Sequence, residues 1–239
     1  VIKGSPSFVN SRELFNKYKS LQTELYEVRT STLKSADFYS REDTCQNGEI
    51  KILYVGVLSF NKGLRELMDA FTLLVNDSHN ITLNFVGLDY SSDKPVEKHL
   101  RQRAKDLRIE HRVFFHGYRK NGKSLNEIYR MSDIYIIPSY FEGFPRTIWE
   151  AMANGLPVIA TKVGSIPFIL EENETAILID SKSISQIKDA IIKLITNESL
   201  RKHLIYKGHM LALEHTLEKQ TKLLIDRLSQ TYQERNFKL

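Results

Sequence analysis

From Lys51 onward, short apolar runs alternate with amphipathic segments, and this alternation limits the possible folds more than any other feature of the sequence. The runs are rich in Val, Ile, Phe or Tyr, and several of them end in Gly or Pro. In chain order they read KILYVG, ITLNFVG, RVFFHG, DIYIIPS, LPVIAT and AILI. Nearly continuous apolar strands suit a parallel sheet that is covered on both faces. We therefore predict an α/β protein with a doubly wound parallel sheet of the Rossmann-like kind.

Helical periodicity fills the segments between these runs. Residues 63–75 carry one apolar stripe at helical spacing, made of Leu64, Leu67, Met68, Phe71, Leu74 and Val75. A serine followed three residues later by Glu or Gln marks the start of two further helices. These capping pairs are Ser124 with Glu127 and Ser183 with Gln186.

Two flanks do not follow this alternation. The segment 1–36 predicts one helix, SRELFNKYKSL, followed by a short strand, LYEVRTS. Residues 37–48 are polar and rich in turn formers, which predicts a linker. The α/β unit then covers 49–205, and 206–239 form a long helical tail. The apolar stripe of the tail, with charges elsewhere, favours a solvated capping helix over a membrane anchor.

Composition and charge exclude several classes of function. The formal net charge is +5, but the Lys and Arg residues are scattered, so no nucleic-acid partner is predicted. The lone cysteine, Cys45, cannot form an internal disulfide and fits a reducing compartment. No apolar run reaches the ~18–20 residues that a membrane-spanning helix needs. The sequence begins with Val1 rather than Met, and we expect it to be a piece of a longer chain.

The segment YFEGFPRTIWEAMANGLPVIAT, residues 140–161, places two carboxylates around one turn. Glu142 is predicted in a loop after a strand, and Glu150 follows in the next helix. Such a loop lies at the carboxyl end of a sheet strand, where open α/β sheets bind ligands. Gly143 lets a ligand approach the backbone, and the amides at the helix start favour anions. The alternative is structural, because an acid near a helix start is also a favourable dipole partner.

Three blocks of sequence resemble the family 4 glycosyltransferases, which have the two-domain GT-B fold. The first is PSYFEGFPRTIWEAMANGLPVIATKVGSIP, in which the two Glu residues of the family motif are followed by an Ala-Met-Ala run. The others are ILYVGVLSFNKGLRELMDAF and VFFHGYRKNGKSLNEIYRMSDIYIIPS. The resemblance implies the C-terminal, donor-binding half of a retaining glycosyltransferase. It also implies that 1–36 are a remnant of the acceptor-binding N-terminal domain, toward which the helix 206–239 packs back.

The resemblance implies a role for each matching residue. Glu150 would accept hydrogen bonds from the ribose hydroxyls of a nucleotide, since two carboxylate oxygens suit a vicinal diol. Glu142 would lie against the donor sugar near the reacting carbon. Lys62 would neutralise the diphosphate, which gains negative charge as it leaves. Glu142 and Lys62 are thus the predicted catalytic residues.

Further donor-binding residues come from the same motifs. They are Gly56 of the phosphate segment, Gly143, Phe144, Pro145 and Arg146 of the loop, and Gly117 with Tyr118 at the nucleobase. Loop amides would face the sugar or the phosphate, except at Pro145, which has no N–H to offer. His116, at the end of a strand, is predicted to be structural.

One departure from the family pattern concerns charge. The arginine that the family carries after the first glycine is replaced by Val57. Arg146, Arg65 or a residue elsewhere could compensate for it. The acid of a later family segment is replaced by Phe168, so no role is assigned there. The departure at Val57 keeps open a second interpretation, in which the chain is a nucleotide-sugar binding module or partner subunit without catalysis.

No metal and no other cofactor is expected, because the His and acidic residues are not at ligand spacing. The resemblance implies a UDP- or GDP-sugar donor and a saccharide or lipid-linked acceptor, in polysaccharide or glycolipid synthesis. It implies a cytoplasmic protein, with peripheral association at the inner face of the membrane as an option. The chain alone is expected to be incomplete, so that it binds nucleotide sugar weakly and transfers poorly.

Two other enzyme classes share this kind of fold. A sugar-nucleotide epimerase stays open as an alternative, although the two-Glu motif followed by EAMANG is more typical of transferases. A dinucleotide-dependent dehydrogenase is disfavoured, since no G-x-G-x-x-G follows the first strand.

Overall fold

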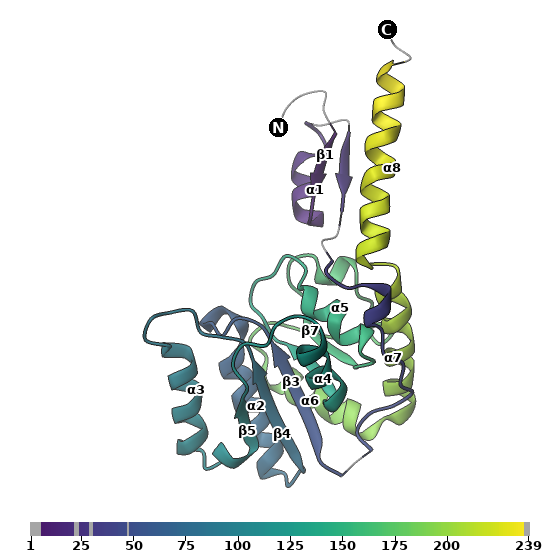
Figure 1. The fold of residues 1–239 in the computed structure, drawn as a ribbon. Coiled ribbons are helices and arrows are strands. Elements are labelled where there is room, and N and C mark those ends of the chain that lie inside the picture. The colour runs from purple at the N-terminus through teal and green to yellow at the C-terminus, as the bar shows by residue number, and fades with distance from the viewer. Residues whose placement is uncertain (1–5, 22–23, 29–30, 47, 237–239) are drawn as a thin grey trace.

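In the computed structural model, which describes residues 6–21, 24–28, 31–46 and 48–236, the centre of the molecule is a six-stranded parallel sheet (Figure 1). Its strand order is β5-β4-β3-β6-β7-β8. The strands are β3 (Ile50–Val55), β4 (Ile81–Val86), β5 (Val113–Phe115), β6 (Ile134–Ile137), β7 (Val158–Thr161) and β8 (Ile177–Ile179). Each strand coincides with one predicted apolar run, and the doubly wound α/β fold is confirmed.

Helices cover both faces of this sheet. They are α2 (Leu64–Asn76), α3 (Pro95–Asp106), α4 (Lys123–Met131), α5 (Arg146–Ala153) and α6 (Ile184–Thr196). Apolar side chains of α2, α3 and α6 form one core, and those of α4 and α5 form a second core on the other face. Along β3, Ile52 and Tyr54 belong to the first core, whereas Leu53 and Val55 belong to the second. Burial on both faces explains why the strands are continuous apolar runs.

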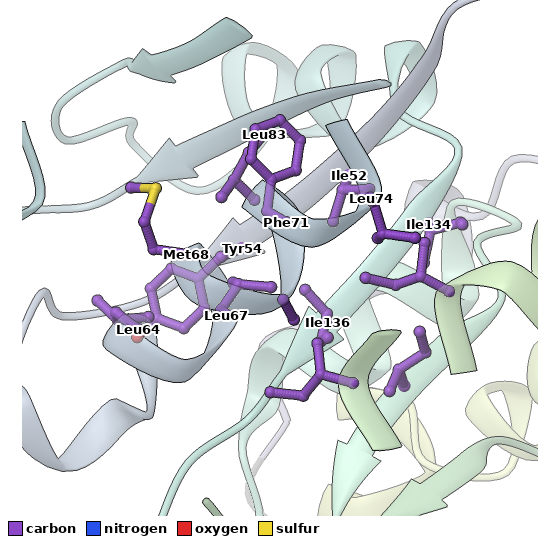
Figure 2. Packing of buried hydrophobic residues seen from close by; sticks show 14 of the residues in the cluster. Ile52, Tyr54, Leu64, Leu67, Met68, Phe71, Leu74, Leu83, Ile134 and Ile136 are labelled. Carbon is purple, nitrogen blue, oxygen red and sulfur yellow. The ribbon is translucent and has the colours of Figure 1, made fainter. Parts of the chain in front are cut away.

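The predicted stripe of α2 packs onto the central strands. Figure 2 shows Phe71 and Leu74 of α2 among Ile52 and Leu83 of β3 and β4. These side chains are completely buried. Full burial of one such side chain stabilises the fold by about 1.5–3 kcal/mol. The packing therefore holds α2 against β3 and β4.

One of the two predicted helix caps is confirmed. Ser183 precedes α6, and its Oγ accepts a hydrogen bond from the Gln186 amide at 3.3 Å. The cap expected at Ser124 is wrong, because α4 begins at Lys123 and Gly122 precedes it. Gly122 has a φ of +110°, which glycine adopts readily and serine rarely does, so the chain enters the helix two residues earlier.

The order of the strands reverses between β3 and β6. From β3 the chain continues to β4 and β5 on one side of the sheet, and it then returns to pair β6 with the other edge of β3. Loops that leave the carboxyl ends of two such strands diverge and open a crevice between them. The topology itself therefore determines where a ligand can bind.

A small separate unit precedes this domain. β1 (Ser7–Val9) and β2 (Leu25–Glu27) form a two-stranded parallel sheet, and α1 (Arg12–Tyr18) connects them. The predicted helix and strand are present but shorter than expected, and β1 is an additional strand. Residues 29–30 of the expected strand lie outside the described residues.

The C-terminal tail consists of α7 (Glu198–Leu213) and α8 (Leu217–Asn236), and α8 rises beside the small N-terminal unit (Figure 1). The Leu217 amide donates to the Leu33 carbonyl at 2.7 Å, and the Arg227 guanidinium lies 5.3 Å from the centroid of the Tyr26 ring. The boundary expected at residue 206 falls inside α7. The division into domains, including an acceptor-binding remnant, stays a prediction.

The segment predicted as a linker lies along the surface of the α/β domain. The Tyr39 amide donates to the Ala153 carbonyl at 2.8 Å. Arg41 donates through Nε to the Gly155 carbonyl at 2.9 Å and through Nη1 to the Arg130 carbonyl at 3.0 Å. These bonds hold the segment against the ends of α4 and α5.

A buried ion pair provides a second anchor for this segment. Asp43 contacts Arg201 of α7 at 2.8 Å, and the two side chains are only 2% and 6% exposed. Burial alone would raise the pKa of Asp43, but hydrogen bonds from Arg201 and from the Thr44 amide lower it below the usual value. The pair therefore stays charged at neutral pH.

Replacing Asp43 by Ala should lower the free energy of unfolding by about 3 kcal/mol, because the Arg201 charge is then buried without its partner. Urea denaturation followed by circular dichroism measures this change. Lys202→Gln is the control, since the Lys202–Glu198 pair lies exposed on the same helix. An Asp43→Ala variant as stable as this control would contradict the anchoring role.

Candidate functional site

A crevice with a volume of about 380 Å³ opens at the carboxyl edge of the sheet. Its walls are the loops that follow β3, β4, β5 and β6, together with the first turns of α5. The predicted site residues that line it are Gly56, Lys62, Tyr118, Glu142, Pro145, Arg146 and Glu150. The predicted residues Gly117, Gly143 and Phe144 adjoin these residues but do not line the crevice itself. The fold thus brings together residues that are far apart in the sequence.

Close backbone packing holds the loop after β3 against the end of β6. Gly63 has a φ of +65°, and a Cβ atom at this position would lie 2.0 Å from the Pro138 carbonyl oxygen. No residue with a side chain fits this contact. The Tyr140 amide also donates to the Asn61 carbonyl at 2.9 Å. Lys62 is therefore fixed beside the loop that carries Glu142.

Lys62 and Glu142 form an ion pair at the reversal of strand order. Lys62 Nζ lies 2.5 Å from Glu142 Oε1, which also accepts a hydrogen bond from Ser139 Oγ at 2.7 Å. The two side chains are 20% and 12% exposed, so the pair is partly shielded but still borders the crevice. In the free protein Glu142 balances the charge of Lys62, and an anion that enters the crevice competes for the lysine.

The loop after β7 supports Glu142 from behind. Gly164 has a φ of +57°, and a Cβ atom there would lie 1.8 Å from the Glu142 carbonyl oxygen. The Ser165 amide donates to the Gly143 carbonyl at 2.8 Å, and Ser165 Oγ accepts from the Arg12 amide of α1 at 3.2 Å. Packing against the Glu142 carbonyl therefore requires glycine at position 164, whichever residues follow it in the segment GSIP.

Glu150 is a buried carboxylate on the opposite side of the loop. The residue is 9% exposed, and its Oε2 accepts a hydrogen bond from the Tyr129 hydroxyl at 2.9 Å. Burial raises the pKa of Glu150, while the Tyr129 bond and the charge of Arg146 oppose this rise. Burial and the nearby Glu150 charge raise the pKa of Tyr129, so its hydroxyl stays a donor. Residues that the structure describes form no hydrogen bond to Glu150 Oε1, which can accept one from a ligand.

Three glycines lie side by side where β3, β4 and β5 end. The Gly56 amide donates to the Val86 carbonyl, and the Gly87 amide donates to the Gly117 carbonyl, each at 2.9 Å. Sequence reasoning misses three residues of this wall, which are Gly87, Tyr90 and Asn121. Gly87, which ends the run ITLNFVG, could have been predicted to line the crevice. The strand formed by this run, β4, pairs with β3, which is formed by KILYVG.

An aromatic stack connects the loop to the C-terminal tail. The ring centroid of Phe144 lies 4.5 Å from that of Trp149. Trp149 in turn stacks on His215, with centroids 4.3 Å apart and an interplanar angle of 17°. His215 lies between α7 and α8, so the loop, α5 and the tail share one packed cluster.

Among the residues that the structure describes, no group of three His, Cys, Asp or Glu side chains could hold a metal ion. His116, predicted to be structural, hydrogen-bonds Asn84 Oδ1 through Nε2 at 2.9 Å and does not line the crevice. Across the described part of the chain, each helix is too short or too polar to span a bilayer.

A Rossmann-like domain with a crevice at its strand reversal has the architecture of α/β proteins that bind ligands at this point. Comparison with known families makes this assignment more specific. The family model of the group 1 glycosyl transferases matches residues 36–210. The chain belongs to this family of transferases.

Relatives and solved structures agree with this assignment. The chain is 28% identical over 203 residues to N-acetyl-alpha-D-glucosaminyl L-malate synthase of Bacillus anthracis, covering 84% of this chain and 51% of that protein. It is 27% identical over 197 residues to the capsular polysaccharide biosynthesis glycosyltransferase CapM of Staphylococcus aureus, covering 81% and 48%. The structure of HepE from Anabaena in complex with UDP is similar in fold, with a TM-score of 0.83 at 20% identity, covering 95% of this chain and 64% of that one. This chain spans about half the length of the curated relatives that it matches.

Glu150→Gln is expected to stabilise the free protein at pH 7, by on the order of 1 kcal/mol, the scale of buried polar substitutions. Burial raises the pKa of Glu150 above 4.5, so the ionised carboxylate destabilises the fold at every pH above its own pKa. Glutamine can still accept the Tyr129 hydrogen bond. The gain should vanish as the pH falls through the pKa of Glu150, because the wild-type carboxyl group then takes up a proton. Thermal unfolding at a series of pH values measures it.

The matched control is Glu127→Gln, an exposed glutamate on α4. Its melting temperature should follow that of the wild type across the same pH series. A wild type that is more stable than Glu150→Gln at pH 7 would show that its surroundings favour the ionised carboxylate, against the burial argument.

Proposed function

We propose that this chain is the donor-binding half of a retaining glycosyltransferase, which moves a sugar from a UDP- or GDP-sugar to an acceptor hydroxyl. The observation that carries the proposal is the crevice at the strand reversal, where the Lys62–Glu142 pair and the buried Glu150 border one space. Membership of the group 1 glycosyl transferases supports the transfer. The UDP in the HepE structure supports the class of donor.

In this proposal the donor lies across the crevice. Glu150 accepts hydrogen bonds from the ribose hydroxyls, and the nucleobase rests near Gly117 and Tyr118. Gly56 leaves room for the phosphates beside the end of β3. The amides of Gly143, Phe144 and Arg146 face the sugar or the diphosphate, while Pro145 contributes only shape.

Transfer breaks the bond between the anomeric carbon and the diphosphate oxygen, and the electron pair leaves with the diphosphate. Lys62 stabilises this developing negative charge. Once Lys62 contacts the diphosphate, the Glu142 carboxylate faces the positive charge that develops on the sugar ring. The acceptor oxygen bonds to the carbon from the face that the diphosphate leaves, and its proton passes to a diphosphate oxygen. The configuration is thereby retained, with protein cations instead of a metal ion balancing the leaving group.

Polysaccharide or glycolipid synthesis is the proposed setting. The name of the relative CapM, for capsular polysaccharide biosynthesis, supports a saccharide or lipid-linked acceptor. The single cysteine, Cys45, is a free thiol, which fits the cytoplasm. A lipid-linked acceptor would bring the enzyme to the inner face of the membrane as a peripheral protein.

Val57 favours a second candidate, a nucleotide-sugar binding subunit without catalysis. This apolar residue lines the crevice and is 43% exposed, at the position where the family carries an arginine. Assays of donor hydrolysis and transfer with the full-length protein separate the two candidates. An enzyme loses activity in Lys62→Ala and Glu142→Gln, whereas a binding subunit shows no activity even as the wild type.

Nucleotide binding is the direct test of the donor site. UDP or GDP should raise the melting temperature of this chain, since a ligand at 100 times its Kd stabilises the folded state by about 2.7 kcal/mol. Trp149, the single tryptophan, lies at the base of the loop and offers a fluorescence signal for the same titration. Glu150→Ala should weaken binding by about tenfold or more, because two ribose hydroxyls lose their charged acceptor.

Glu127→Ala serves as the control and should bind like the wild type. The screen includes UDP, GDP and ADP and their sugars. A wild type whose melting temperature and fluorescence respond to none of them does not have this site.

A further inference from the structure

The charges that border the crevice do not balance a diphosphate if Lys62 acts alone. The cationic side chains that line it are Lys62, Arg119 and Arg146, and the carboxylates are Glu142 and Glu150. Lys62 and Glu142 neutralise each other across 2.5 Å. A bound nucleoside diphosphate adds two or more negative charges to this pair. A second cation close to Lys62 is therefore needed for tight binding.

The loop after β3 does not supply that cation. Val57 lines the crevice with an apolar side chain. Its carbonyl oxygen accepts a hydrogen bond from the buried Tyr54 hydroxyl at 2.8 Å, which fixes the loop at this point. The position next to the strand end is thus held by a hydrogen bond but carries no charge.

Arg146 comes from the loop that faces Lys62. It is the first residue of α5 and follows β6, and β6 pairs directly with β3 through Ile52 and Ile134. Arg146 and Lys62 therefore lie on the two sides of the same strand reversal. The first turn of α5 borders the same crevice through Arg146 and Thr147, and a helix N-terminus adds positive potential there.

The other arginines are less well placed. Arg119 also lines the crevice, but it follows β5, which β4 separates from β3, whereas β6 pairs directly with β3. Its Nη1 donates to the Tyr118 carbonyl at 3.3 Å. Arg65 does not line the crevice. Burial raises the pKa of Tyr140, and the Arg65 charge opposes this rise.

The Arg146 guanidinium is available to a ligand. The residue is exposed, and no carboxylate of the described residues lies within 4.0 Å of its nitrogens. Its charge reaches Glu150, where it counteracts the effect of burial on the pKa of that carboxyl group. Arg146 therefore borders the same crevice as the predicted ribose acceptor and the Lys62–Glu142 pair. A planar guanidinium with several donors suits phosphate oxygens better than a point charge does.

We propose that Arg146 binds the diphosphate of the donor and supplies the second positive charge that is absent at Val57. This inference rests on the proposed function of the crevice. Arg146 and Lys62 hold the diphosphate from two sides, and both stabilise the charge that it gains when the bond to the sugar breaks.

The test compares nucleotides that differ only in their phosphates. Titrations of UDP, UMP and uridine, or of the guanosine set if the wild type prefers it, are followed by Trp149 fluorescence or calorimetry at constant salt. Arg146→Gln should raise the Kd of the diphosphate by about tenfold or more, the scale of a hydrogen bond to a charged group. The Kd of the nucleoside should stay unchanged. Arg65→Gln is the control, since it removes the same charge nearby but outside the crevice, and it should bind like the wild type.

A second variant tests whether charge is what Arg146 contributes. Val57→Arg, combined with Arg146→Gln, should recover most of the lost diphosphate affinity without changing nucleoside affinity. The inference is overturned if Arg146→Gln binds the diphosphate like the wild type, or if it loses affinity for the nucleoside by the same factor. A wild type that binds no nucleoside diphosphate at all removes the proposed function and this inference with it, so the two failures are distinct.

Discussion

The parallel pairing of β3 with β6 is the constraint on which the site depends. Because the strand order reverses at this pair, two loops that are about eighty residues apart in sequence begin side by side and then diverge. Gly63 and Gly164 tighten this arrangement, since each packs its backbone against a carbonyl oxygen where no Cβ atom would fit. The two cores on either face of the sheet hold the strands in register behind them. The crevice is therefore a product of topology and backbone packing more than of its own side chains.

Within this frame, the proposed chemistry depends on a change in the partners of Lys62, Glu142 and Glu150. Lys62 and Glu142 satisfy each other in the free protein, and Glu150 is buried with one hydrogen bond from Tyr129. An anion that draws Lys62 away leaves Glu142 free to face positive charge. A diol that reaches Glu150 offsets part of the free energy that its burial costs. In the proposed complex the ligand thus relieves one unfavourable feature of the free site, the burial of the Glu150 carboxylate, while it replaces Glu142 as the partner of Lys62.

The sequence predicted the fold well because its signals are local. Every apolar run became a strand, and the stripe of α2 became a core face, since both faces of the sheet are buried. The prediction of a helix cap at Ser124 was wrong, because Gly122 adopts the backbone conformation that precedes the helix two residues earlier. The capping pair of Ser124 with Glu127 does not contain this information. The predicted site residues converge, although their roles stay predictions. Gly87 and Tyr90 were missed, because their place beside Gly56 depends on which strands are neighbours. The path of residues 37–46 also depends on contacts with residues that are distant in the sequence, such as Arg201.

In the proposed complex, a nucleoside diphosphate occupies the crevice at the start of α5. A crystal structure of this chain with UDP or GDP tests it most directly. We expect a ribose hydroxyl within about 2.6–3.2 Å of a Glu150 oxygen and a diphosphate beside Lys62. A nucleotide bound elsewhere on the molecule, or a crevice closed by the protein's own side chains in the presence of saturating nucleotide, would contradict it.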